Sequence, residues 1–307
     1  MRLLVHGQQA FGKSVLEALL DRGENVVAVY GPEDKDGRVD PLIAEARERN
    51  LPVYQPKSFR NNEEVAAECE AIEADLGVMA FVTKFVPSTF LDIPKHGTIQ
   101  YHPSLLPLHR GPSSINWPII QGRSETGLSI FWPDDGLDEG PILLQKTVQI
   151  EPEDTLGSVY FNKLFPLGIE AMLEAVDLVR GGKAPKIEQD HTKKTYESWC
   201  KKEDAQIDWS KPVNEVHNLI RGCNPSPGAW CDFAGDALQI FDCKRDDQIS
   251  GEAGSVTEIL DSSFSVACGI GGVRIERVRY QSRDKISASD FVQAQKIELG
   301  TRLGNQP

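Results

Sequence analysis

Residues 97–146 read GTIQYHPSLLPLHRGPSSINWPIIQGRSETGLSIFWPDDGLDEGPILLQK. The stretch opens with a short apolar strand, 98–101, which ends at His102 in a Pro-Ser-Leu-Leu-Pro loop. An expected helix over 114–121 precedes a second apolar strand, 128–132, which leads into the acidic turn PDDGLDEG. In α/β proteins, ligands bind where strands end at the edge of the sheet. The polar segments after these two strands are therefore expected to converge on one site.

The chain before this stretch alternates between short apolar runs and amphipathic segments. The expected strands are 2–6, 25–30, 51–54 and 76–82, and the expected helices between them are 13–22, 41–49 and 63–74. Strands that alternate with helices build a parallel sheet covered on both faces. The sequence therefore predicts the α/β class, with a Rossmann-like, mostly parallel sheet.

After the acidic turn the pattern changes twice. A long helix, bent at Pro166, is expected to start at the Asp154-Thr155 cap. Residues 181–203 are polar and lack sustained periodicity, so they are the expected linker. Short β segments with glycine breaks follow, which is typical of a small barrel or sandwich. We therefore predict an N-terminal domain over 1–203 and a smaller β domain over 204–307.

Composition limits the classes of function. The 307 residues carry a formal charge of −13, which disfavours a broad nucleic-acid surface because phosphate contacts need clustered Lys and Arg. Six cysteines are scattered without CxxC spacing, so neither a zinc ribbon nor a disulfide framework is indicated. The six histidines show no metal-ligand spacing either. Without an apolar run long enough for a signal peptide or a membrane span, a cytoplasmic protein is expected.

Three motifs of this chain occur together in one enzyme family. They are HPSLLP at 102–107, Arg-Gly at 110–111 and GLDEG at 136–140. In these motifs the chain resembles the folate-dependent formyltransferases, most closely the hydrolase branch that releases formate. The segment 207–230, with its DW…P…IR…PGAW pattern, resembles the entrance to the OB-like C-terminal domain of the family. The resemblance implies a catalytic domain over 1–203, a small OB-like barrel after it, and 10-formyltetrahydrofolate as formyl donor.

The resemblance also implies catalytic residues. Formyl transfer or hydrolysis passes through a tetrahedral carbon with developing oxyanion charge, and it needs groups that move protons. By resemblance, Asp138 orients or deprotonates the attacking water, and His102 donates to the formyl oxygen. Gln100 is a departure, since transferases of the family carry Asn and the hydrolases an apolar residue there. Glutamine keeps an amide donor on a longer stem, so both an oxyanion role and a plain polar strand position stay open.

The pterin ring of the folate has an expected binding place as well. Lys84, Phe85 and Val86 occupy the position where the family's backbone and apolar side chains hold this ring. The loop that contains Asp134 and Asp135 would lie opposite. Backbone groups beside an aromatic and an aliphatic residue suit a flat heterocycle. Phe85 and Val86 fit ordinary core packing equally well.

A competing motif lies near the N-terminus. Residues 7–14, GQQAFGKS, satisfy the P-loop pattern GxxxxGK[ST]. No later strand ends in a clear Walker-B aspartate, because Asp75 precedes its strand. The spacing is not GxGxxG, and no nicotinamide cofactor is expected. We therefore expect a tight strand-to-helix turn here without a phosphate role, and no bound metal.

Three acceptors of the formyl group compete. Water fits the hydrolase branch, and an amine of a sugar or another small molecule is the alternative. Residues 224–229, NPSPGA, resemble the second domain of the enzymes that formylate methionyl-tRNA. The loop 31–40 is nevertheless short and acidic, whereas those enzymes carry a longer basic segment, and the overall charge also disfavours tRNA. We predict a 10-formyltetrahydrofolate hydrolase, and the alternative hypothesis is a formyltransferase that passes the formyl group to an amine.

Overall fold

The computed structural model describes residues 1–304, and they divide into two compact units. The first unit comprises Met1–Arg110, Gly127–Val148 and Lys163–Tyr196, and the second comprises Gly111–Thr126, Gln149–Asn162 and the described residues from Glu197 onward. Residues 305–307, at the end of the predicted 204–307 domain, lie outside the described residues. Since both units draw on several chain segments, the single boundary near Glu203 stays a prediction.

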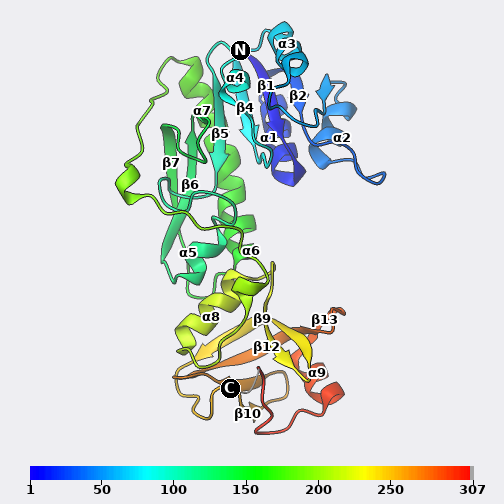
Figure 1. The fold of residues 1–307 in the computed structure, drawn as a ribbon, viewed down its shortest axis with the longest axis vertical. Helices are drawn as coiled ribbons and strands as arrows, with labels where there is room; N and C mark the ends of the chain where they lie inside the picture. Colours follow the sequence, from blue (N-terminus) through cyan, green and yellow to red (C-terminus); the bar gives the residue numbers. More distant parts are fainter. Residues whose placement is uncertain (305–307) are drawn as a thin grey trace. The chain divides into compact units, whose positions relative to one another are not determined.

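A mostly parallel sheet forms the centre of the first unit (Figure 1). Its strands are β1 (Arg2–Gly7), β2 (Asn25–Tyr30), β3 (Val53–Tyr54), β4 (Leu76–Ala80), β5 (Thr98–His102), β6 (Glu125–Phe131) and β7 (Ile142–Gln149). Their order across the sheet is β3-β2-β1-β4-β5-β6-β7. The pairs from β3 to β5 are parallel, and β6 pairs with β5 in the antiparallel direction. The predicted Rossmann-like sheet is confirmed.

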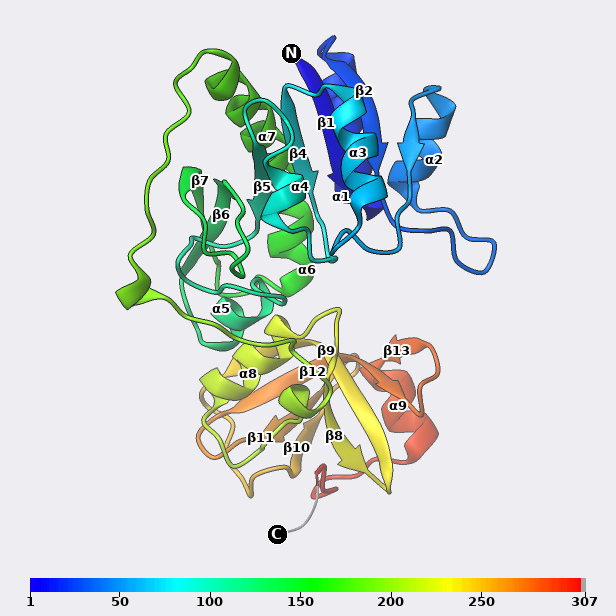
Figure 2. The ribbon, with the colours of Figure 1, turned by 45° about the horizontal axis from the view of Figure 1, so that its top comes forward.

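Helices cover both faces of this sheet. They are α1 (Gln9–Asp21), α2 (Pro41–Glu48), α3 (Glu63–Ile72), α4 (Ser88–Leu91) and α7 (Phe165–Arg180). Helix α1 contacts α2 and α7, while α3 contacts α4. Figure 2 shows α3 and α4 on the face of the sheet opposite to α7. The ring centroid of Phe11 in α1 lies 4.3 Å from that of Tyr101 in β5. The side chain of Tyr101, the residue before His102, therefore lies on the face of the sheet that α1 covers.

The P-loop-like turn after β1 is occupied by side chains of the chain itself. A Cβ atom at Gly7 would overlap a carbonyl oxygen of β4, so the turn requires glycine. Asp40 accepts hydrogen bonds from the backbone N–H of Gln9 at 3.0 Å, which places a carboxylate at the start of α1. The Lys13 ammonium lies 3.3 Å from Glu45. The Asp40 carboxylate thus binds a backbone N–H at the start of α1, and Glu45 pairs with the ammonium of Lys13. Both are groups that a bound phosphate would need.

The long helix expected after Asp154 is divided. It consists of α6 (Leu156–Ser158), a π-helical segment over Val159–Leu164, and α7. Thr155 caps the start through a reciprocal hydrogen-bond pair with Ser158. Pro166 lacks an N–H group and cannot donate to the carbonyl one turn earlier, which accounts for irregular pairing just before it.

The second unit contains a smaller antiparallel sheet. Its strands are β8 (Ala229–Phe233), β9 (Asp236–Asp246), β10 (Val256–Ile259), β11 (Phe264–Ala267), β12 (Gly272–Tyr280) and β13 (Lys285–Ser287). The order is β10-β11-β12-β9-β8, with β13 on β12. The unit's helical segments are α5 (Asn116–Ile120), α6, α8 (Val213–Gly222), α9 (Ala288–Gln295) and a 3-10 turn over Glu203–Ala205; the other 3-10 turn, His191–Lys193, belongs to the first unit.

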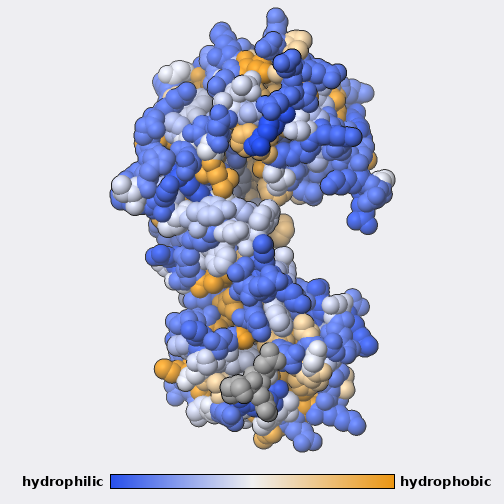
Figure 3. All heavy atoms as spheres, viewed as in Figure 1, coloured by the Kyte–Doolittle hydropathy of each residue, from blue (hydrophilic) through white to orange (hydrophobic). Residues whose placement is uncertain are grey.

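Helix α8 packs its apolar side, with Val216 and Ile220, into the core of this sheet. On the face shown in Figure 3, hydrophilic residues cover most of the surface. Within residues 1–304, no helix is long and apolar enough to cross a bilayer. The cytoplasmic location stays a prediction.

Candidate active site

The loop after β5 is held in a tight curve by one hydrogen bond within the loop and one from strand β6. The Ser104 hydroxyl donates to the carbonyl of Leu108 at 2.6 Å, and Ser129 of β6 donates to the carbonyl of Ser104 at 2.7 Å. The curve brings the carbonyl oxygen of His109 back over the strand end, 2.9 Å from Nε2 of His102. Ser104 therefore shapes the loop that orients the predicted catalytic histidine.

The structure brings His102 and Asp138 together. Nδ1 of His102 lies 3.6 Å from Oδ2 of Asp138, and the residues are only 6% and 8% exposed. A carbonyl oxygen only accepts hydrogen bonds, so the contact with His109 assigns a hydrogen to Nε2 of His102. Nδ1 is then the ring atom at which a proton can be gained or released, and it faces the carboxylate.

The backbone at Asp138 adopts an uncommon conformation. Its φ angle is +53°, in the left-handed region, which Asp tolerates better than most residues. Gly140, two residues on, packs so closely against Trp132 that a Cβ there would overlap the Trp132 carbonyl oxygen. The GLDEG motif therefore folds into a turn that directs Asp138 inward toward the end of β5.

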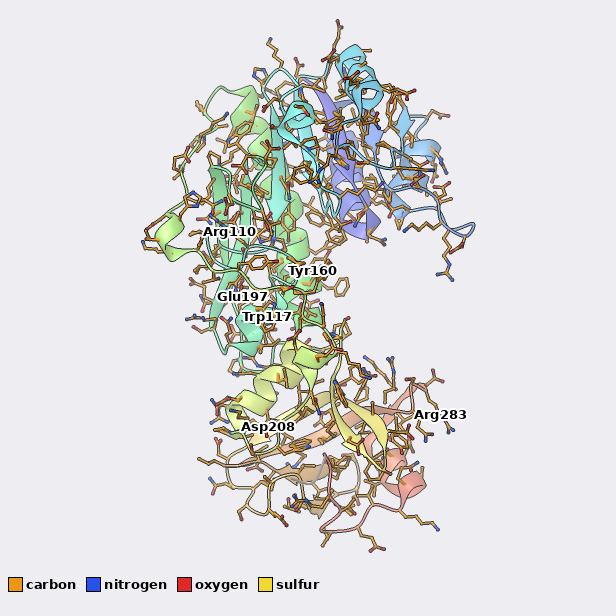
Figure 4. The ribbon with its side chains drawn as sticks, viewed as in Figure 1. Arg110, Trp117, Tyr160, Glu197, Asp208 and Arg283 are labelled. Atoms are coloured by element: carbon orange, nitrogen blue, oxygen red, sulfur yellow. The ribbon has the colours of Figure 1, made fainter. Side chains whose placement is uncertain are left out.

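A buried polar network lies behind this pair. Arg110, labelled in Figure 4, is only 3% exposed. It donates to Oε1 of Glu139 at 2.7 Å and to Oε1 of Gln189 at 2.6 Å. The Gln189 amide nitrogen donates to the carbonyl oxygens of Asp138 at 2.9 Å and Gly140 at 2.8 Å. The loop that follows His102 and the turn that carries Asp138 are thus joined through one glutamine side chain.

Gln100 lies on the same strand as His102, two residues earlier. Side chains two residues apart on a strand share a face and stand roughly 7 Å apart. Gln100 is half-buried and pairs with Phe131 of β6 across the ladder. The side chain of Gln100 therefore lies on the same face of the sheet as His102, roughly 7 Å along the strand from it.

The three residues predicted to hold the pterin differ in their surroundings. The Lys84 ammonium donates to the carbonyl of Pro56 at 2.7 Å. The Phe85 ring is 44% exposed, and the guanidinium of Arg60 lies 4.7 Å from its centroid. Val86 is buried in the core cluster under α3 and α4. Phe85 offers an accessible aromatic face, whereas Val86 offers only its backbone.

The opposing loop is fixed to this segment. Asp134 accepts a hydrogen bond from the backbone N–H of Gly136 at 2.9 Å, which closes a local turn. Asp135 accepts from the backbone N–H of Ser88 at 2.9 Å and from its hydroxyl at 2.8 Å. These bonds hold the pKa of Asp135 below its usual value. Asp135 thus joins the loops that carry Phe85 and Asp138.

A separate cavity of about 580 Å³ lies in the second unit, beside α5 and α8. None of the residues predicted for catalysis lines it. Its buried Arg221 is engaged with Asn218 at 2.9 Å and with the carbonyl of Asp154 at 3.1 Å. We therefore place the candidate active site at His102 and Asp138, where a buried imidazole and a buried carboxylate approach each other at the end of a strand.

Sequence reasoning missed two residues of the polar network. They are Gln189 and Thr195, and both fall in the polar segment 181–203, the expected linker. The Thr195 hydroxyl accepts a hydrogen bond from the backbone N–H of His109 at 2.8 Å. Arg110 stood in a quoted motif, but no role was assigned to it. No periodic pattern marks Gln189 or Thr195, because their partners are far away in the sequence. Within residues 1–304, no group of three His, Cys, Asp or Glu side chains is arranged as metal ligands would be.

Comparisons with known proteins agree along the chain. Residues 1–176 match the family model described as formyl transferase, and residues 200–296 match the formyl transferase C-terminal domain. Mitochondrial 10-formyltetrahydrofolate dehydrogenase of Mus musculus is 45% identical over 245 residues, which are 78% of this chain and 26% of that protein. The chain thus spans about a quarter of the length of the dehydrogenases that it matches.

Two further comparisons cover nearly all of both partners. Methionyl-tRNA formyltransferase of Geobacter sulfurreducens is 34% identical over 99% of this chain and 97% of its own. The crystal structure of an N-formyltransferase from Helicobacter canadensis, in complex with folinic acid and dTDP-3-aminofucose, has a TM-score of 0.69 at 18% identity and covers 90% of this chain and 98% of that one. With both domains matched in order and relatives above 30% identity, this chain belongs to the formyl transferase family.

Proposed function

We propose that this chain takes the formyl group from 10-formyltetrahydrofolate and passes it to water, releasing formate and tetrahydrofolate. The observation that supports this most is the buried approach of His102 and Asp138 to 3.6 Å at the end of β5. The 45% identity with a 10-formyltetrahydrofolate dehydrogenase adds support for the donor. The division into a catalytic domain, 1–203, and a C-terminal domain, 204–307, is part of the same proposal.

The proposed reaction assigns one task to each side chain. The Asp138 carboxylate accepts a proton from water while the water oxygen bonds to the formyl carbon. With its ring protonated on both nitrogens, His102 donates a hydrogen bond from Nδ1–H to the formyl oxygen, where negative charge develops. The bond from the formyl carbon to N10 then breaks as N10 takes up the proton that Asp138 received from water, and the formic acid released ionises to formate. Burial of both groups strengthens these interactions, since less water screens them.

The folate would lie between the two joined loops. The accessible ring of Phe85 and the backbone of residues 84–86 would contact the pterin on one side. Asp134 and Asp135 would form the other wall, with the hydrogen bonds to Ser88 fixing the spacing of the two loops. Gln100 would direct its amide toward the formyl oxygen from the His102 face of β5. A rigid aromatic wall with backbone donors and acceptors suits a flat heterocycle.

Charge favours water over tRNA as the acceptor. The chain carries −13, and the acidic loop 31–40 uses Asp34 to pair with Arg47 at 3.0 Å, which removes that arginine from phosphate binding. An amine of a sugar or another small molecule is the second candidate. The N-formyltransferase of Helicobacter canadensis, whose structure contains an amino sugar nucleotide, supports it at the level of the fold.

Turnover without an amine tests this proposal. The purified chain is incubated with 10-formyltetrahydrofolate alone and with added amines, and tetrahydrofolate is measured. Release of tetrahydrofolate at the same rate with and without an amine supports hydrolysis. Release that begins only when an amine is added supports transfer and overturns the choice of water. His102→Ala and Asp138→Ala should abolish turnover in either case, and full activity in both variants would remove them from the mechanism.

A further inference from the structure

Residues 187–195, which we call the clamp segment, run along both loops of the candidate active site. Ile187 pairs through its backbone with Ile142 of β7, at 2.8 and 2.9 Å, directly after the acidic turn. At its other end, Thr195 donates its N–H to the carbonyl of Pro107 at 3.2 Å, in the loop after His102. One short segment therefore contacts the loop of each catalytic residue.

Gln189 forms the central connection of the clamp segment. It is 4% exposed, and its amide group uses both ends. Its oxygen accepts two hydrogen bonds from Arg110, and its nitrogen donates to the carbonyls of Asp138 and Gly140. An amide has one oxygen with two lone pairs and two N–H donors, so every hydrogen-bonding position of this side chain is used. Asparagine is the one other neutral side chain with this set, and its stem is one methylene shorter.

Thr195 forms the second connection, on the His102 side. Its hydroxyl accepts from the backbone N–H of His109 at 2.8 Å, and its carbonyl accepts from the N–H of Arg110 at 3.1 Å. The carbonyl of the same His109 residue receives the hydrogen bond from Nε2 of His102. Displacement of His109 would therefore rotate the imidazole and move Nδ1 relative to Asp138.

We propose that the clamp segment sets the separation of His102 and Asp138, with Gln189 and Thr195 as positioning residues. The inference rests on the proposed function, since it concerns the geometry of that same pair. Asp138 has a left-handed backbone that needs outside support, and Gln189 supplies it through the carbonyl group of Asp138. Displacements of about 1 Å in a catalytic pair can lower a rate by roughly a hundredfold, so the clamp affects turnover more than folate binding.

Gln189→Glu tests this directly. The carboxylate keeps the acceptor for Arg110, which favours folding, but it cannot donate to Asp138 and Gly140. We expect kcat to fall about 10- to 100-fold while KM for 10-formyltetrahydrofolate changes within about twofold. Glu188→Gln is the matched control, because this neighbour is exposed. Equal kcat in Gln189→Glu and the wild-type chain would overturn the inference.

Thr195 allows a rescue experiment. Thr195→Val removes the acceptor for His109 and should lower kcat, whereas Thr195→Ser keeps the hydroxyl and should restore it. Equal loss in both variants would indicate a structural defect and contradict the positioning role.

A measurement independent of turnover separates this inference from the proposed function. The ¹⁵N resonances of the His102 ring, assigned with His102→Gln, are followed across pH in each variant. They should differ from the wild-type chain in Gln189→Glu and match it in Glu188→Gln. If wild-type protein shows no turnover with water or amines, the proposed function fails, and the ring signals still test the clamp. If turnover is present and the ring signals are unchanged in Gln189→Glu, only the clamp fails.

Discussion

Nδ1 of His102 lies 3.6 Å from Oδ2 of Asp138, with both side chains buried at the end of β5. At this separation the atoms are not hydrogen-bonded to each other, yet a single reacting group can contact both. Such contacts are often loose in an unliganded site and tighten when substrate binds. The pair therefore suits a reaction in which protons move to and from one small carbonyl group.

Asp138→Asn should separate chemistry from binding. Asparagine tolerates the left-handed backbone at this position but cannot take a proton from water. We expect kcat to fall by about 10²- to 10⁴-fold, the usual contribution of a general base. Affinity for folinic acid, measured by calorimetry, should change little. Asp92→Asn, at an exposed position of the same unit that has no part in the proposed site, serves as control, and a comparable loss there would contradict the assignment.

Asp40→Ala should destabilise the first unit. The carboxylate accepts from the backbone N–H groups of Gln9 and Leu42, at 3.0 and 2.9 Å, and so supports the starts of two helices. Loss of these buried acceptors should lower the free energy of unfolding by about 1–3 kcal/mol. Urea titration followed by circular dichroism measures it. Asp92→Ala, at an exposed position of the same unit, should leave the midpoint unchanged.

His6 should make the protein less stable in acid. Burial, with a smaller contribution from Lys84, lowers the pKa of His6 to about 3 from 6.5. The unfolded chain therefore binds a proton below pH 6.5 that the folded chain does not bind until about pH 3. This difference favours unfolding increasingly as pH falls through that window, by about 2 kcal/mol at pH 5.

His6→Leu should remove this part of the acid sensitivity. Nδ1 of His6 is buried without a hydrogen-bond partner, so the replacement deletes a polar atom that gains nothing from the core. Urea midpoints at pH 8 and pH 5 should differ less in the variant than in the wild-type chain. An identical pH dependence in both proteins would show that His6 does not titrate as its surroundings indicate.

Cys200 should be the most reactive thiol. Its Sγ lies 3.9 Å from Sγ of Cys223, and this hydrogen bond lowers the pKa of Cys200. Burial raises the pKa of Cys69, Cys231 and Cys268 to about 12. Brief alkylation with iodoacetamide at pH 7.5, followed by peptide mass mapping, should therefore modify Cys200 first.

Cys223→Ala provides the control for this order. Removal of the hydrogen bond should slow alkylation of Cys200. Modification of Cys69 at the rate of Cys200 in folded protein would contradict the prediction, since a buried thiol with a raised pKa carries little thiolate.

Local patterns predicted the sheet well, because burial on both faces leaves continuous apolar strands such as Leu76–Ala80. The pairing of His102 with Asp138 came from the resemblance, since separate motifs supplied the two residues. The roles of Gln189 and Thr195 were not predictable in the same way. A polar residue in a segment without periodicity is assigned to a linker until its distant partners are known. The partners of Gln189 and Thr195 include backbone groups that no sequence pattern identifies.

The helix start at Gln9 illustrates the same limit. The sequence suggested a helix from about residue 13, whereas α1 begins at Gln9. No local side chain caps it, and the carboxylate that accepts its first N–H group comes from Asp40, beyond the next strand. Capping by a distant residue leaves no signal in the window that a local pattern covers.

Isotope transfer from solvent tests the central claim most directly. The chain is incubated with 10-formyltetrahydrofolate in ¹⁸O-enriched water without any amine, and formate is analysed by mass spectrometry beside tetrahydrofolate. Attack by water at the formyl carbon predicts formate with one ¹⁸O atom in equal amount to tetrahydrofolate, and none from His102→Ala. An intact donor after prolonged incubation, consumed only when an amine is supplied, would contradict the account.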